Sequence, residues 1–290
     1  MPASIPPAIV AEIEAYTGSP VTAFAPASGG CINHGGRIAT SGGRCFLKWN
    51  DLRKFPGMFY AEARGLSLLG KAEALRVPDV IHAGAAGDFQ FILLEYIAAG
   101  ARSRNYWRDF GAGLAALHMK SATEFGLDHD NYIGSLPQKN TLTSSWIEFF
   151  IEQRLEVQLQ IARDEGRLGE GFSKKFEALF NRLSSLLPEE PPALLHGDLW
   201  GGNLMTTSEG EPCVIDPAVY YGNREADLAM TQLFGGFDPS YIDRYNEVHS
   251  LLPGYEARLD LYNLYPLLVH VNLFGGGYMG QVVSILNRFA

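Results

Sequence analysis

Residues 194–204 of this 290-residue chain read LLHGDLWGGNL, and residues 213–217 read CVIDP. In the first stretch four residues separate Asp198 from Asn203, and Asp216 follows thirteen positions after Asn203. Short apolar segments at 204–205 and 213–215 flank the polar residues 206–212, a pattern typical of a β-hairpin. We therefore predict that this hairpin brings Asn203 and Asp216 together.

An aspartate, an asparagine five positions later and a second aspartate at a strand end match the catalytic residues of kinases. Phosphoryl transfer needs a carboxylate that deprotonates the attacking hydroxyl, and hard oxygen ligands that hold Mg²⁺ across the phosphates. Asp198 is thus the predicted catalytic base, Asn203 and Asp216 are the predicted Mg²⁺ ligands, and ATP is the predicted phosphoryl donor. The competing interpretation, a turn at 196–198 that only caps a helix, leaves the other two residues unexplained.

A lysine inside an apolar strand supports the same interpretation. Lys48 lies in the segment Cys45-Phe46-Leu47-Lys48-Trp49, where its charge is costly to bury without an anionic partner. Glu62, in the next helical segment, is the predicted partner, and Lys48 is predicted to contact the α- and β-phosphates of ATP. The alternative is an exposed edge-strand lysine and an unrelated surface glutamate.

Two backbone segments are also predicted to bind ATP. Ser28, Gly29 and Gly30 lie between the first two predicted strands, where glycines let backbone N–H groups approach phosphate oxygens. This turn departs from both the G-x-G-x-x-G and the P-loop patterns, and a plain hairpin turn is the alternative. Glu95, Tyr96 and Ile97 end the last predicted strand, where adenine meets backbone donors and acceptors in a two-lobed kinase; a simple linker is the alternative there.

The order of elements predicts an α+β fold of two lobes. Residues 1–96 predict a five-stranded antiparallel sheet, with strands within 21–49, at 79–83 and at 89–96. One helix, at 59–69 and ending at Gly70, is expected to pack on this sheet, and another helix is expected at 9–16. Residues 97–290 have helical periodicity at 107–119, 146–161, 172–187 and after 227. We therefore predict a protein-kinase-like fold, with a nucleotide-binding lobe at 1–96 and a helical lobe at 97–290 that carries the catalytic loop and the substrate pocket.

Asp227 is predicted to cap a helix or brace the catalytic loop.

The composition narrows the class of partners. A net charge of −9 and a pI near 5.3 argue against a general nucleic-acid binder, which needs a basic surface. The N-terminal residues have no signal-peptide pattern, and polar residues and a proline interrupt the apolar stretch 264–273. We therefore predict a cytoplasmic protein without a membrane span.

The three cysteines form no C-x-x-C pair, which argues against a disulfide framework or a structural zinc site. Cys31 directly follows the glycine turn, where peptide N–H dipoles and Lys48 could favour its thiolate, so we predict that it is redox-sensitive. A small residue accepted in a tight turn is the alternative. Cys45 and Cys213 lie in apolar strands and are predicted to be buried and inert.

Four segments resemble the fructosamine kinase (ketosamine 3-kinase) family, a branch of the aminoglycoside phosphotransferase-like kinases: residues 29–33, 196–203, 216–218 and 221–230. The resemblance covers nearly the whole chain, and Trp200 is its most specific residue. It implies ATP-dependent phosphorylation of the sugar 3-hydroxyl of ketosamines (fructosamines or ribulosamines), the Amadori adducts of proteins or free amines, which leads to deglycation. It also implies that Trp200 borders the sugar pocket; an ordinary core tryptophan is the alternative.

The sequence differs from protein kinases at three points. Gly197 replaces the arginine of the His-Arg-Asp motif, Pro217 follows the metal-binding aspartate, and no Ala-Pro-Glu segment follows. We therefore expect no control by a phosphorylated activation loop and no protein-kinase activity. An aminoglycoside, choline or homoserine kinase is the alternative function, and a nucleotide-binding pseudoenzyme is a remote one. The preferred sugar, a protein-bound or free substrate, and a monomer or homodimer are left open.

Overall fold

The computed structural model describes residues 5–27 and 33–290. The chain divides into two compact units, one made of Met1–Tyr106 and Met205–Asp216, the other of Trp107–Leu204 and Pro217–Ala290. The lobe limits expected from the sequence, 1–96 and 97–290, remain a prediction. Each compact unit consists of two separate stretches of the chain, because residues 205–216, which include the hairpin, belong to the same unit as the N-terminal segment.

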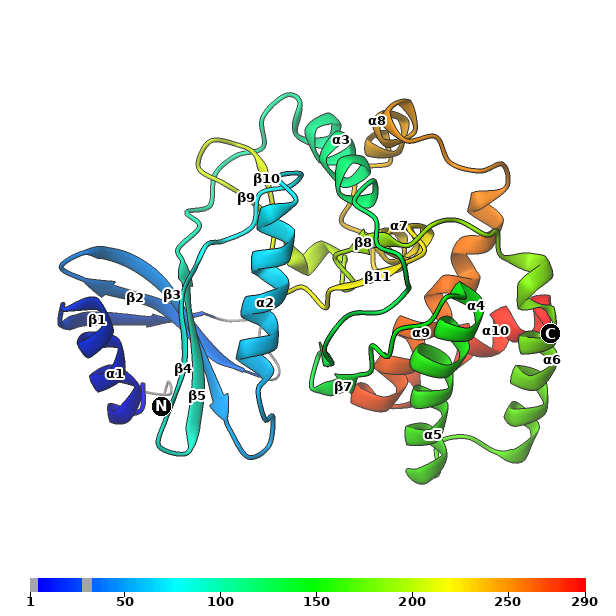
Figure 1. Cartoon of the computed structure of the whole chain (residues 1–290), viewed down its shortest axis with the longest axis horizontal. Helices are drawn as coiled ribbons and strands as arrows, with labels where there is room; N and C mark the ends of the chain where they lie inside the picture. The colour runs from blue at the N-terminus through cyan, green and yellow to red at the C-terminus, as the bar shows by residue number, and fades with distance from the viewer. Residues whose placement is uncertain (1–4, 28–32) are drawn as a thin grey trace. The chain divides into compact units, whose positions relative to one another are not determined.

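The N-terminal unit is built on a five-stranded antiparallel sheet with the strand order β1-β2-β3-β5-β4 (Figure 1). The strands are β1 (Val21–Pro26), β2 (His34–Thr40), β3 (Gly43–Asp51), β4 (Val80–Ala86) and β5 (Phe89–Glu95). Tight turns of small residues join β2 to β3 and β4 to β5. This confirms the predicted sheet.

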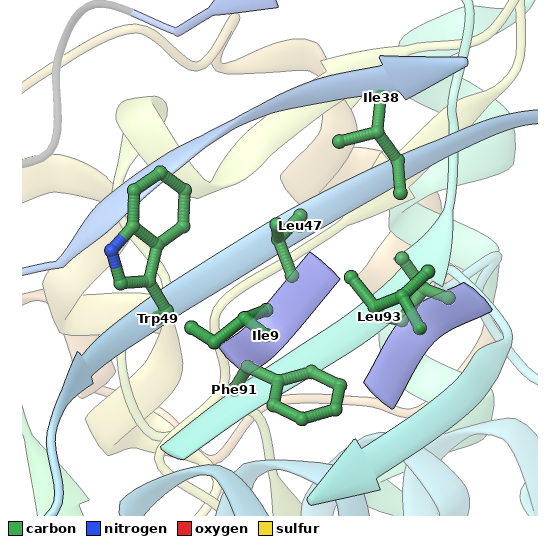
Figure 2. Close-up of a cluster of buried hydrophobic side chains, with 7 residues drawn as sticks. Ile9, Ile38, Leu47, Trp49, Phe91 and Leu93 are labelled. Carbon is green, nitrogen blue, oxygen red and sulfur yellow. The ribbon is translucent and has the colours of Figure 1, made fainter. Parts of the chain in front are cut away.

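Two helices pack on this sheet, where the sequence predicted one. On one face, Ile9 and Ile13 of α1 (Pro7–Thr17) join a buried cluster with Ile38, Leu47, Trp49, Phe91 and Leu93 from the central strands (Figure 2). The opposite face carries α2 (Met58–Lys71), which continues through Gly70 instead of ending there (Figure 1). Because side chains alternate along a strand, β3 presents Leu47 and Trp49 to α1 and Lys48 to the α2 face.

The predicted hairpin at residues 204–215 is confirmed. It consists of β9 (Leu204–Thr206) and β10 (Pro212–Val214). Backbone hydrogen bonds from Gly100 N to Thr206 O (3.1 Å) and from Val214 N to Arg76 O (2.9 Å) attach it to the N-terminal unit. These contacts hold the end of β10 in place.

The second unit is mainly helical, as predicted. Its helices are α3 (Tyr106–His118), α4 (Trp146–Phe149), α5 (Glu156–Asp164), α6 (Glu170–Leu186), α7 (Glu225–Leu233), α8 (Ser240–Val248), α9 (Tyr255–Phe274) and α10 (Met279–Phe289). Most of α9 is buried, and it packs against α5, α7 and α10 (Figure 1). A helix that is apolar on all sides belongs in the middle of a core, which is the place of α9 in this unit.

Short elements fill the gaps between the helices. A π-helical segment, η1 (Phe150–Leu155), joins α4 to α5, and two 3₁₀ turns occur, η2 (Gly201–Asn203) and η3 (Gly276–Tyr278). Two antiparallel strand pairs form, β6 (Asn131–Ile133) with β7 (Leu136–Gln138), and β8 (Ala193–Leu195) with β11 (Tyr220–Gly222). Over residues 5–27 and 33–290, no helix has the length and apolar content needed to cross a membrane.

Candidate functional site

Lys48 forms two ion pairs within the N-terminal unit. Its Nζ lies 2.6 Å from Glu62 Oε1 and 3.0 Å from Asp216 Oδ1. The Lys48 and Glu62 side chains are almost fully buried, whereas the side chain of Asp216 is 48% exposed. The predicted pairing of Lys48 with Glu62 is therefore present, and Asp216 joins it.

The two carboxylates keep Lys48 charged. Burial disfavours the ammonium, but the attraction of Asp216 and Glu62 outweighs it and holds the pKa of Lys48 above its usual value. Buried ion pairs add little net stability, because the cost of desolvation offsets the attraction. A buried ammonium that stays charged can bind an anionic group such as a phosphate.

Asp216 reaches Lys48 through the β9–β10 hairpin, although 168 positions separate the two residues. Its backbone has a φ of 54°, in the left-handed region that few residues other than glycine, asparagine and aspartate adopt. Backbone of this kind is concentrated at functional sites. The sequence predicted the hairpin and the ligand role of Asp216 but not its contact with Lys48.

Asp198 and Asn203 contact each other in the second unit. The chain leaves β8 through His196 and Gly197, and η2 then returns Asn203 toward Asp198. Asn203 Nδ2 donates hydrogen bonds to the Asp198 carbonyl (2.9 Å) and to Asp198 Oδ2 (3.0 Å). Since the amide nitrogen is used in both contacts, the amide oxygen is the atom of Asn203 that a cation would bind.

Asp227 braces this loop from α7. Its Oδ2 accepts a hydrogen bond from His196 N (2.7 Å), and its Oδ1 accepts one from Gly197 N (2.9 Å). His118 Nε2 lies 3.2 Å from the same carboxylate. Burial alone would raise the pKa of Asp227, but the hydrogen bond and charge of His118 lead the contributions that hold this pKa below its usual value. The predicted bracing role of Asp227 is confirmed.

Gly197 is required by the local geometry of the loop. It has a φ of +82°, and a Cβ at this position would lie 2.0 Å from the carbonyl oxygen of Ala218. The Ala218 N–H in turn donates to His196 O (2.9 Å). The glycine that replaces the arginine of protein kinases thus permits a close backbone approach that no other residue allows.

Trp200 is a surface residue, which excludes the core tryptophan considered as an alternative. It is 39% exposed, and its ring meets Phe234 edge to face at 6.3 Å between centroids. Phe234 also contacts His270 (4.6 Å) and Tyr278 (6.2 Å). A Cβ on Gly202 would lie 2.2 Å from the Trp200 ring, which explains a glycine there. These aromatic neighbours could not be predicted from the sequence, because they come from distant positions: the C-cap of α7, α9 and η3.

The predicted glycine turn precedes β2. Ser28, Gly29, Gly30 and Cys31 lie outside the residues that the structure describes. Asn33, just after them, accepts a hydrogen bond from Asn50 Nδ2 (2.8 Å).

At the end of β5, the predicted adenine-binding segment 95–97 has other contacts. Glu95 pairs through its carboxylate with Arg76, and its N–H donates to Asp79 O (2.8 Å). Tyr96 lies under the guanidinium of Arg37 (5.6 Å), and Ile97 is buried. The roles of all these residues in ATP binding remain predictions.

The two described cysteines differ in burial. Cys213 is fully buried, which confirms the predicted burial, and burial raises the pKa of its thiol to about 12, which favours the predicted inertness. Cys45 is only half-buried, in contrast to the prediction, because it lies near the exposed start of β3. Burial still raises the pKa of Cys45.

Comparison with known proteins supports the same type of site. The family model for fructosamine kinase matches residues 6–290. The chain belongs to the fructosamine kinase family. It is 39% identical to a probable ketoamine kinase of Synechocystis, over 97% of this chain and 95% of the relative. It is 40% identical to the chloroplastic protein-ribulosamine 3-kinase of Arabidopsis thaliana, over 93% of this chain and 83% of the relative.

Solved structures agree with this assignment. A crystal structure from Thermobifida fusca, described as a candidate fructosamine-3-kinase, superposes with a TM-score of 0.86 at 38% identity and covers 96% of this chain and 97% of its own. A spectinomycin phosphotransferase in complex with ADP and spectinomycin superposes with a TM-score of 0.59 at 15% identity, covering 97% of this chain and 92% of its own. The second likeness concerns the fold alone and supports the predicted protein-kinase-like fold.

Proposed function

We propose that this chain is an ATP-dependent kinase that phosphorylates the sugar 3-hydroxyl of ketosamines, such as fructosamines and ribulosamines. Membership of the fructosamine kinase family and relatives named ketoamine kinase and protein-ribulosamine 3-kinase support this substrate class. The observation that carries the chemistry is the Asp198 carboxylate, which Asn203 holds at 3.0 Å in a loop braced by Asp227.

The proposed mechanism assigns one task to each polar group. Asp198 accepts the proton of the attacking hydroxyl, since a carboxylate held in one orientation can act as a general base. Lys48, oriented by Glu62, binds phosphate oxygens. Asn203 and Asp216 offer hard oxygen ligands of the kind that Mg²⁺ takes in kinases, and bound Mg²⁺ supplies positive charge that neutralises the phosphates.

A substrate panel tests the proposed function. ATP consumption is measured with fructosyl-lysine, ribosyl-lysine, an aminoglycoside and choline, and the Asp198→Asn variant serves as the control for contaminating ATPases. We expect turnover with at least one ketosamine and with neither of the other two acceptors. Turnover with the aminoglycoside or choline alone would replace the proposal with a different small-molecule kinase.

Substitution of the proposed Mg²⁺ ligands should reduce the dependence of nucleotide binding on magnesium. In Asn203→Ala and Asp216→Ala one oxygen ligand is lost, so the Kd for ATP with Mg²⁺ should rise about tenfold or more. Calorimetric titration with and without Mg²⁺ measures the effect. Asp260→Ala, which removes a half-exposed carboxylate paired with Arg288, is the matched control. An unchanged magnesium dependence in both ligand variants would refute the assignment.

Trp200→Ala should impair the binding of the sugar substrate and not of ATP. Because the ring is exposed, its removal should cost little stability, but an aromatic face next to a sugar is lost. We expect KM for a ketosamine to rise about tenfold, equivalent to about 1.4 kcal/mol, and KM for ATP to stay within about twofold. Leu142→Ala, at another exposed apolar side chain, is the control. Equal increases in both KM values would indicate a general packing role.

A further inference from the structure

A chain of buried amide side chains lies at the β6–β7 hairpin, in a segment that contains none of the predicted site residues. Asn131 and Gln138 face each other across the hairpin, and Gln138 Nε2 donates to Asn131 Oδ1 (2.7 Å). Asn140 Nδ2 donates to the same oxygen (3.1 Å). The exposed fractions of Asn131, Gln138 and Asn140 are 7%, 1% and 1%. We call these three residues the amide chain.

Groups that can only donate or only accept fix the orientation of the amides: the Arg154 guanidinium for Asn140, the Ala218 carbonyl for Gln138 and the Val219 carbonyl for Asn131. Arg154 Nη2 donates to Asn140 Oδ1 (2.8 Å), and a guanidinium has no acceptor, so Asn140 must present its oxygen to Arg154 and its NH₂ to Asn131. Tyr265 OH donates to Gln138 Oε1 (2.7 Å). Burial raises the pKa of Tyr265, which keeps this hydroxyl protonated. Because Gln138 Nε2 donates to the Ala218 carbonyl, Gln138 Oε1 is the atom that accepts from Tyr265.

Arg154 is built into the core to a degree that is unusual for an arginine. It is fully buried, its guanidinium lies 3.9 Å from the ring centroid of Tyr220 and 4.5 Å from that of Phe149, and the π-helical segment η1 supplies it. π-helical turns are frequent at functional sites. Burying an arginine is costly, so a role beyond packing is expected.

The donor ends of the amide chain meet the backbone beside the catalytic loop. Gln138 Nε2 donates to Ala218 O (3.0 Å), and Asn131 Nδ2 donates to Val219 O (2.8 Å). Ala218 O is the atom against which Gly197 packs, and Ala218 N donates to His196 O. The amide chain is thus connected to the loop that carries Asp198 through a single residue, Ala218, which bonds to both Gln138 and His196.

We propose that Gln138 and Asn131, oriented by Arg154 and Tyr265, are positioning residues that hold the Ala218–Val219 backbone and thereby fix the catalytic loop around Asp198. Asp227 holds the N–H groups of His196 and Gly197, and Ala218 holds the carbonyl of His196. The loop is therefore clamped from two sides by buried polar groups. This proposal rests on the proposed function for its kinetic consequence but not for its structural one.

Gln138→Leu tests the proposal, since leucine fills a similar volume but cannot donate to Ala218 O. We expect kcat with a ketosamine to fall by about 10-fold to 100-fold, because a small displacement of a catalytic group lowers the rate strongly, and KM for ATP to stay within about twofold. Amide hydrogen exchange of residues 195–199, measured without substrate, should become about tenfold faster.

Gln158→Leu is the matched control. Gln158 is equally buried, and its side chain accepts a hydrogen bond from Asn272 (2.9 Å), which joins α5 to α9 and not to the catalytic loop. We expect a similar fall in Tm and no change in kcat per folded enzyme or in exchange at 195–199. Equal effects of the two substitutions on kcat and on exchange would overturn the proposal.

A milder pair of variants covers the case in which Gln138→Leu does not fold. Tyr265→Phe removes only the donor to Gln138 and should lower kcat about threefold, whereas Tyr241→Phe, which removes a buried hydroxyl bonded to Thr231 (2.6 Å), should not. Equal kcat in the two tyrosine variants would count against the amide chain. If the wild type has no ketosamine kinase activity, the proposed function fails, and the exchange measurement alone decides whether the amide chain fixes the loop.

Discussion

Asp198→Asn is expected to lower kcat by about 10²-fold to 10⁴-fold and to leave the Kd for ATP within about twofold. The amide has the size of the carboxylate and keeps an oxygen that can accept from Asn203 Nδ2, so the loop should retain its conformation. What is lost is the basicity needed to take the proton of the substrate hydroxyl. Steady-state kinetics with a ketosamine and calorimetric titration with ATP measure the two quantities.

A control variant distinguishes the loss of the catalytic base from the loss of one negative charge elsewhere on the protein. Asp109→Asn removes an exposed carboxylate from the first turn of α3 and should leave kcat unchanged. A fall of less than tenfold in Asp198→Asn would mean that Asp198 is not the base. A large increase in the Kd for ATP would instead give Asp198 a role in nucleotide binding.

Gly197→Ala should affect both stability and activity. A left-handed conformation costs an alanine about 1–2 kcal/mol, and the new Cβ would also lie 2.0 Å from Ala218 O, so the backbone must shift. We expect the free energy of unfolding to fall by about 2–4 kcal/mol, and kcat to fall by about 10²-fold, because the shift moves Asp198.

Gly166→Ala is the matched control for this prediction. Its φ is +66°, but nothing lies within 4 Å of the added Cβ, so it carries the conformational cost without the collision. Urea unfolding and kinetics of both variants separate the two contributions. If Gly197→Ala loses no more stability than Gly166→Ala and keeps its kcat, the close approach to Ala218 has no functional importance.

The sequence predicted those parts of the fold and the site that depend on local patterns. Period-two alternation around Lys48 places the lysine on the opposite face from Leu47 and Trp49, and this is why its pairing with a residue of the next helix could be predicted. The β9–β10 hairpin was predictable for the same reason, since two apolar segments flank a polar turn. Asp227 could be recognised as structural from its position near the start of a helix.

The features that the sequence did not predict depend on contacts between distant segments. That Asp216 joins Lys48 follows from hydrogen bonds that attach the hairpin to residues 76 and 100. Arg154 is buried because it lies in the π-helical segment η1 and because the rings of Tyr220 and Tyr265 pack against its guanidinium. Neither arrangement has a periodicity or a spacing in the sequence that would reveal it, because tertiary packing alone brings these segments together.

The ion pairs of Lys48 affect how the charge of an arriving ligand is compensated. One ammonium lies between two carboxylates, Glu62 and Asp216, so its positive charge is compensated before any ligand arrives. A polyphosphate that enters alone competes with these carboxylates for the ammonium, whereas a nucleotide that arrives with a divalent cation brings additional positive charge. Under the proposed function, we therefore expect the cluster to favour metal-bound over metal-free nucleotide on electrostatic grounds.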